Sequence, residues 1–224
     1  NKGRLEMKRN DSRMLFVMFA LFFLFKDLNL VMATESPPKK WPCDQVYNPK
    51  LNMSAIWEGP DIKDYIKDWW KDDEVIEVAT KLSDPILTEK DGTKIIESFA
   101  KKYTYFGIIA KKEQEEKLVN LFAGLFQKAS DKRRRQYTGI VKFVERQDVI
   151  RKTIGKSSKK LRELRKAGVG QDDKEFLMYS EQMKWNTRVF DQRTRLTEYV
   201  CEEPVYGEQR IGYQARKILS YIKD

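Results

Sequence analysis

The chain has 224 residues, with 44 Lys and Arg against 34 Asp and Glu, and a formal net charge of +10 at neutral pH. It has no histidine and only two cysteines, which excludes an imidazole general base, a His-ligated metal, a Ser-His-Asp triad and a four-Cys zinc site. The sequence also lacks a Gly-rich phosphate-binding loop. We therefore expect no cofactor and disfavour an enzyme, although the abundant carboxylates keep carboxylate-based catalysis open.

The most apolar part of the chain is residues 14–25, an unbroken apolar run preceded by the basic residues Lys8, Arg9 and Arg13. This layout is typical of a secretory signal peptide, and cleavage is expected near Ala33. Residues 1–33 would then be a short upstream stretch plus the signal peptide, and the mature chain would be periplasmic or secreted. Two alternatives stay open: an uncleaved anchor in the inner membrane formed by residues 14–25, or an ordinary buried helix.

The mature chain is also basic. Removing six basic and three acidic residues with residues 1–33 leaves 38 basic and 31 acidic residues. An exported protein rarely meets nucleic acid, so we expect no nucleic-acid partner and favour an envelope protein or an anionic membrane surface. Solubility alone is the simpler explanation of the same charge.

Residues 34–60 contain five prolines, which forbid a regular helix, yet they also carry Trp41 and Trp57. We expect an extended arm docked on the rest of the chain. In an oxidising compartment the two cysteines predict a disulfide between Cys43 and Cys201. Two free thiols, or one thiol that seeks a partner, are the alternatives.

From Asp61 onward the apolar residues recur with a helical period, and residues 61–224 are predicted to form one helical domain. Trp69 and Trp70 lie in an acidic segment near its start. Adjacent helix residues differ in direction by about 100°, so both rings cannot face the same core. An exposed Trp would be a candidate aromatic contact; one buried Trp beside one covered by the arm is the alternative. A helix is expected over residues 112–129, and no strand of useful length.

Residues 131–201 carry the strongest pattern, two rows of residues spaced alternately by three and four on either side of Gly168-Val-Gly170. The first row is Ile140, Phe143, Gln147, Ile150, Ile154, Ser157, Leu161 and Leu164, and the second is Phe176, Tyr179, Met183, Asn186, Phe190, Arg193, Thr197 and Val200. These rows predict an antiparallel hairpin with coiled-coil packing, in which Leu164 meets Phe176 and Gln147 meets Arg193. Pro204 is expected in the first turn of a separate last helix.

The tip of this hairpin is strongly basic. Eight residues form the candidate contact surface, here called the tip cations: Arg151, Lys152, Lys156, Lys159, Lys160, Arg162, Arg165 and Lys166. Such a surface would bind lipid headgroups or an acidic partner. A solvated helix face is the alternative.

Three stretches resemble a group of small exported alphaproteobacterial proteins without an assigned activity. They are Trp41-Pro-Cys-Asp-Gln45 with Ile56-Trp-Glu-Gly-Pro60, then Leu121-Phe-Ala-Gly-Leu125 with Gly139-Ile140 and Glu145-Arg-Gln147, and finally Tyr199-Val-Cys-Glu-Glu-Pro204 with Glu208-Gln-Arg210. The resemblance implies export, a helical body and the placement of both cysteines. It implies no catalytic residue or substrate.

The sequence thus predicts an all-α helical bundle with a long coiled-coil-like hairpin and an extended N-terminal arm. The predicted function is that of an exported binding or accessory protein of the cell envelope. A carboxylate-based cell-wall hydrolase is the alternative, or, without export, a basic nucleic-acid-binding protein. The oligomeric state is left open.

Overall fold

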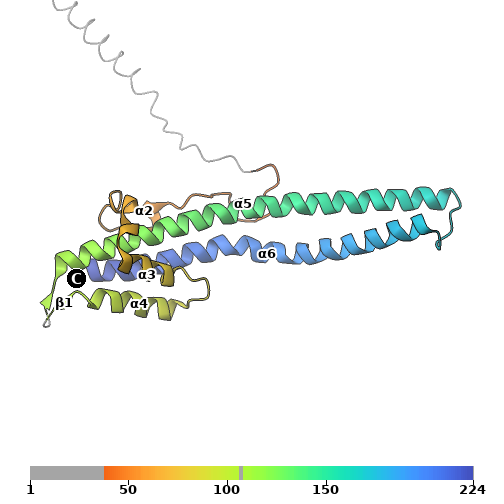
Figure 1. Ribbon diagram of the computed structural model, residues 1–224. Helices are drawn as coiled ribbons and strands as arrows, with labels where there is room; N and C mark the ends of the chain where they lie inside the picture. The colour runs from red at the N-terminus through yellow and green to blue at the C-terminus, as the bar shows by residue number, and fades with distance from the viewer. Residues whose placement is uncertain (1–37, 106–107, 224) are drawn as a thin grey trace, which may run out of the picture. The chain divides into compact units, whose positions relative to one another are not determined.

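The computed structural model describes residues 38–105 and 108–223, all within one compact unit, Ser36–Asp224. The structure is 76% helical with almost no strand, and a long antiparallel hairpin dominates it (Figure 1), so the predicted all-α class is confirmed. In chain order the described helices are α2 (Met53–Ile56), α3 (Asp73–Leu82), α4 (Glu89–Lys101), α5 (Lys111–Lys166) and α6 (Lys174–Lys223). The expected signal peptide lies outside the described residues.

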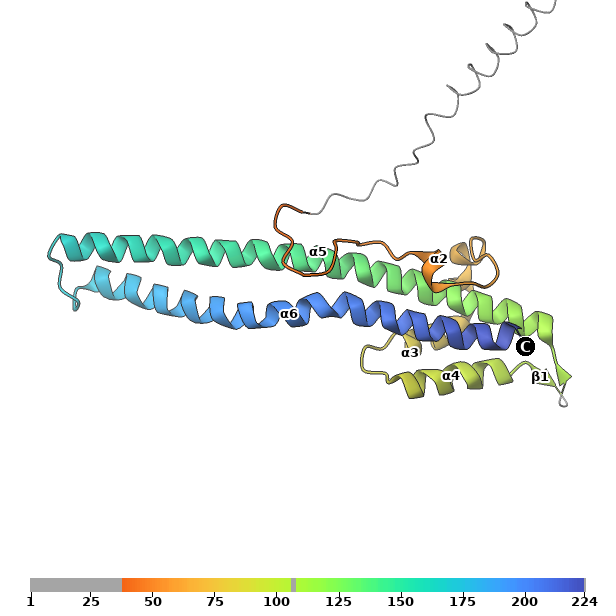
Figure 2. The ribbon, with the colours of Figure 1, turned by 180° about the vertical axis from the view of Figure 1, so that it is seen from behind.

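Helices α5 and α6 lie side by side in both ribbon views (Figures 1 and 2). At about 1.5 Å per residue, α5 is about 84 Å long and α6 about 75 Å, so the hairpin is longer than residues 131–201 predicted. The expected end of a helix at residue 129 was wrong, because α5 runs on to Lys166. The chain from Leu125 to Thr138 contains neither Pro nor Gly, and Asp131 forms an ion pair with Arg134 one turn on, so the helix continues.

The predicted helix start at Pro204 was also wrong, because Pro204 lies inside α6. A proline within a helix lacks an N–H and pushes away the carbonyls of the preceding turn. Here a residue distant in sequence supports the preceding turn, since the Gln45 amide donates to the carbonyl of Cys201. The helix passes through the proline, and the Arg133 guanidinium donates to the carbonyl of Pro204 at 3.4 Å.

The main core lies where α3 and α4 pack on the first part of α5 and the last part of α6. Its fully buried members include Val75, Ile96, Phe122 and Ile218. The arm contributes Trp57, whose ring stacks on Phe122 with centroids 3.9 Å apart. The base of the hairpin is thus the compact part of the unit.

The segment between the arm and α3 forms two short 3-10 turns, Tyr65–Lys67 and Trp69–Lys71, where a helix was expected. Aspartate side chains explain the difference, because they bind nearby backbone N–H groups in competition with a helix. Asp61 accepts from the N–H of Lys63, and Asp72 caps α3 by accepting from the N–H of Val75.

Two-residue strands, β1 (Thr104–Tyr105) and β2 (Ile108–Ile109), pair antiparallel just before α5. They are too short to change the class.

The tip of the hairpin has a small core of its own. Leu161, Leu164 and Phe176 are buried there, with Tyr179 and Met183 packed against them. Gly168 lies in the turn with φ of 75°, a conformation that favours glycine. The predicted meeting of Leu164 and Phe176 is confirmed.

Candidate interaction surfaces on the hairpin

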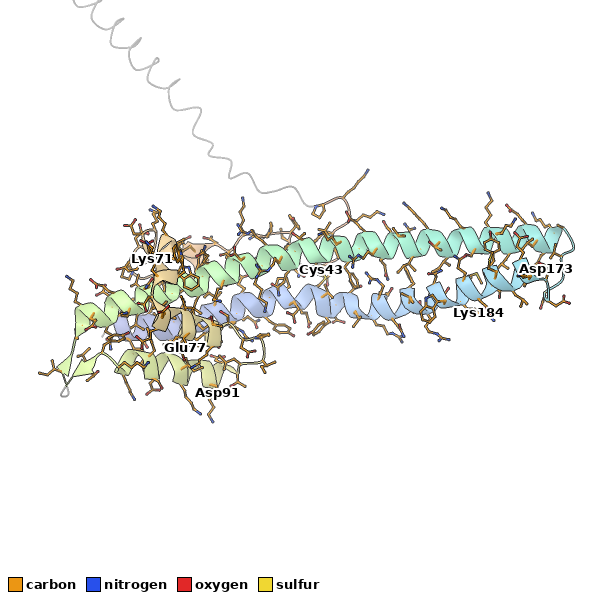
Figure 3. The ribbon with its side chains drawn as sticks, viewed as in Figure 1. Cys43, Lys71, Glu77, Asp91, Asp173 and Lys184 are labelled. Atoms are coloured by element: carbon orange, nitrogen blue, oxygen red, sulfur yellow. A yellow bond between two sulfur atoms is a disulfide. The ribbon has the colours of Figure 1, made fainter. Side chains whose placement is uncertain are left out.

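The arm is fastened to the hairpin at about mid-length, a set of contacts we call the clasp. The expected disulfide is present, with the Sγ atoms of Cys43 and Cys201 2.05 Å apart. Beside it, Gln45 donates to the carbonyl of Cys201. Figure 3 shows Cys43 next to α5. The clasp therefore joins the arm, α5 and α6 near Pro204.

Arg133 of α5 is the buried cation of the clasp. Its guanidinium donates to the carbonyl of Asn48 at 2.8 Å, to a carboxylate oxygen of Glu208 at 2.9 Å and to the hydroxyl of Tyr137 at 3.1 Å. It also lies 4.9 Å from the centre of the Tyr137 ring. The indole of Trp41 stacks on that ring at 5.1 Å. Polar and aromatic contacts together hold the arm on α5.

The tip cations line the distal part of α5, and an acid of α6 neutralises one of them. Lys160 forms an ion pair with Glu175 of α6 at 3.2 Å, which raises the pKa of Lys160. Arg165 lies over the ring of Phe176 at 5.5 Å. The carboxylate of Asp173, labelled at the turn in Figure 3, accepts from the N–H groups of Glu175 and Phe176 at the start of α6.

The remaining tip cations are exposed. Arg151 pairs with Asp148 at 3.1 Å, and Lys159 approaches Glu163 at 3.9 Å. Lys152, Lys156 and Lys166 form no ion pair with any residue that the structure describes. These three residues are the best candidates for an external anionic contact.

The two tryptophans have different surroundings, as expected from their adjacent positions. Trp69 packs on α5, where a Cβ added at Gly124 would lie 2.7 Å from its indole, and its Nε1 donates to Gln127. Trp70 is 56% exposed. Trp70 therefore remains a candidate aromatic contact, and Trp69 is a packing residue.

One surface was missed by the sequence analysis: a second heptad row on α6, here called the outer stripe. Its members are Met178, Gln182, Trp185, Val189, Gln192, Leu196, Tyr199, Glu203 and Tyr206. The spacing alternates between four and three, as in the row that faces α5, but it is shifted by two to three residues. The signal for it in the sequence is this second row of heptad spacing within the same helix.

The largest groove beside the outer stripe has a volume of about 600 Å³. It lies between α6 and the loop before α4, and its lining includes Leu87, Lys132, Glu203, Tyr206 and Arg210. A cavity of about 50 Å³ next to Arg133 and Gln214 is large enough only for a few water molecules. Within the described residues, no group of three or more carboxylates or cysteines could hold a metal ion.

No helix in the described part of the chain is long and apolar enough to cross a membrane. Neither a protein-family model, nor a curated protein, nor a solved structure matches the chain. The resemblance to exported alphaproteobacterial proteins therefore stays a prediction.

Proposed function

We propose that the chain is an exported binding or accessory protein of the cell envelope, and that its hairpin is the contact element. One observation carries the binding role: among the described residues, α5 and α6 alone make up the distal hairpin, beyond the ion pair of the arm residue Lys40 with Asp148 (Figures 1 and 2). A two-helix projection adds little buried area to the core at its base. It does add a long surface that carries the tip cations and half of the outer stripe.

The clasp supports export. A disulfide between residues 158 positions apart persists in an oxidising compartment and is rare in a reducing one. The apolar run at residues 14–25 points the same way. Cell fractionation of the full chain, combined with thiol labelling under denaturing conditions, tests this half of the proposal. We expect an extracytoplasmic protein with both cysteines blocked; a cytoplasmic protein with two free thiols would refute export.

The binding half is tested with charge variants chosen from the structure. Lys152, Lys156 and Lys166 are changed together to Gln, which removes three unpaired tip cations. The matched control changes three exposed lysines of the base, Lys67, Lys90 and Lys112, and so removes the same charge elsewhere.

Both variants are compared with the wild type for binding to vesicles that contain anionic lipid and for retention on immobilised envelope extract. Each well-placed charge is expected to contribute about 1 kcal/mol on an anionic surface. The tip variant should therefore bind at least about tenfold more weakly than the control. Equal binding by the two variants, or no binding by the wild type, would refute a role for the tip cations.

A further inference from the structure

Most of the outer stripe is uncovered within the described residues, although α5 bonds to two of its polar members: Ser157 donates to Gln182 at 3.0 Å and Gln136 donates to Glu203 at 3.4 Å. Five of its members, Met178, Trp185, Leu196, Tyr199 and Tyr206, are each 51–64% exposed. Heptad spacing keeps them on one face of α6 over 28 residues, or about 42 Å. Large exposed apolar residues that share one face mark an interaction site more often than scattered ones do.

The same row continues toward the C-terminus, and there it is covered. The next two members are Arg210 and Tyr213. The Arg210 guanidinium donates to the carbonyls of Asp84 and Pro85, just before α4. Tyr213 packs against Gly92 of α4, where an added Cβ would lie 2.5 Å from the tyrosine oxygen. A helix of this chain therefore already occupies one end of the row.

This continuity indicates what kind of partner fits the rest. The row meets the loop before α4 at Arg210 and α4 itself at Tyr213, whereas its five large apolar members from Met178 to Tyr206 are exposed, with the same heptad spacing. The groove of about 600 Å³ lies at the boundary, beside Glu203 and Tyr206. A second helix lying on the stripe would end in this groove, close to the start of α4.

The charge of the hairpin distinguishes between possible helices. Residues 138–201 contain 15 Lys and Arg against 9 Asp and Glu. Arg188 and Arg195 are exposed and border the middle of the stripe one heptad apart, with Glu181 and Glu202 at the same heptad position toward its two ends. A second copy of this chain would bring the same positive excess to the contact, and like charges oppose association. A helix with acidic flanks would instead pair with these cations.

A lipid surface fits this face less well. Glu203 lies within the stripe, and Glu202 borders it with its carboxylate bound to the hydroxyl of Tyr206 at 3.0 Å. Those acids would face the anionic headgroups that the tip cations attract. A narrow stripe of heptad period also matches a helix better than a plane.

We propose that the outer stripe binds an amphipathic, acidic α-helix of another protein. This inference deepens the proposed binding role and rests on it, but it does not depend on export. The apolar side of the partner helix would cover Trp185 and Leu196, and its acidic residues would lie near Arg188 and Arg195.

The test uses the oxidised full chain and a synthetic peptide of about four heptads, with Leu at the two core positions and Glu at the flanking positions. A second peptide carries Lys in place of Glu. Calorimetry measures affinity, and circular dichroism measures the helix gained on binding. We expect the Glu peptide to bind at least about tenfold more tightly than the Lys peptide.

Two variants locate the site. The double change Trp185→Glu and Leu196→Glu should weaken binding of the Glu peptide at least about tenfold, because large apolar residues dominate such contacts. The control, Val149→Glu, replaces an exposed apolar residue of α5 outside the stripe and should change the affinity less than about twofold. All three positions are exposed, so the fold is retained.

Three outcomes would overturn the inference. The first is no binding of the Glu peptide, or equal binding to both variants. The second is a wild-type dimer in sedimentation that the double change dissociates, because the occupant would then be a second copy. The third is loss of vesicle binding in the double variant, which would make the occupant a membrane. If the Glu peptide does not bind while the tip variant still loses envelope binding, the proposed partner helix is wrong but the proposed binding role of the hairpin is retained.

Discussion

Replacing Arg133 with Met is expected to loosen the arm and lower the free energy of unfolding by about 2 kcal/mol. Met is similar in length and apolar, so the packing volume is largely kept while all the hydrogen bonds are lost. The change therefore isolates the polar part of the clasp, because the disulfide between Cys43 and Cys201 stays in place.

The magnitude follows from the partners left behind. Tyr137 is 1% exposed, and without the guanidinium its hydroxyl loses its donor, which costs about 1–3 kcal/mol. The carbonyl of Asn48 lies on an exposed residue and can turn to water, so its lost bond costs only about 1 kcal/mol. Removing a buried guanidinium returns some desolvation energy. A net loss of about 2 kcal/mol remains.

The measurement is urea unfolding of the oxidised protein, followed by far-UV circular dichroism and by tryptophan fluorescence. Arg134→Met is the matched control, because Arg134 is exposed and its only described ion pair is with Asp131; we expect less than about 0.5 kcal/mol. Arg133→Lys should recover less than half of the loss, since an ammonium cannot reach these acceptors together. A loss below about 0.5 kcal/mol for Arg133→Met would show that these bonds do not hold the arm.

Three other changes probe the unit. Changing Cys43 and Cys201 to Ser opens a loop of 158 residues and should cost up to about 5 kcal/mol, measured by unfolding; a variant as stable as wild type would refute a stabilising disulfide. Hydrogen bonding to Lys102, opposed by burial, lowers the pKa of Glu74, so its stabilising effect is present above about pH 4.5 and is lost as the pH falls through the lowered value. The Glu74→Gln variant should accordingly lose less stability than wild type between about pH 5 and pH 3; parallel curves would contradict this. Gly124→Ala places a Cβ 2.7 Å from the indole of Trp69 and should lower the free energy of unfolding by about 1–3 kcal/mol. Unchanged stability would show that the ring can move aside.

The hairpin was predictable because its information is local and periodic. The row from Ile140 to Leu164 fixed both the helix and the face it buries, and the Gln147–Arg193 pair appears as expected, with the two side chains 3.0 Å apart. Pro204 was not predictable in the same way. Whether a helix passes through a proline depends on tertiary contacts at the preceding turn, such as the bond from Gln45 to the carbonyl of Cys201, 156 residues away in the sequence.

The candidate surfaces were also predictable only in part. The tip cations follow from composition along one helix, but their partial neutralisation by Glu175 depends on the pairing of two helices. The outer stripe is encoded in α6 as clearly as the row that faces α5. Which of two rows is buried is decided by the neighbours: the loop before α4 covers the second row at Arg210, and α4 covers it at Tyr213.

The seam between α5 and α6 is closed by buried apolar side chains at both ends and largely by hydrogen bonds of Gln147, Ser157 and Arg193 between them. Leu161, Leu164 and Phe176 form a buried apolar cluster at the tip. Farther from the turn, the heptad register of the two helices places the polar residue Asn186 opposite Ile154. Local opening requires little free energy where few apolar contacts are lost. Backbone amides near Ile154 should therefore exchange with solvent faster than those near Leu161, although Leu161 lies nearer the tip of the hairpin. The middle of the hairpin would therefore open to solvent more often than either end.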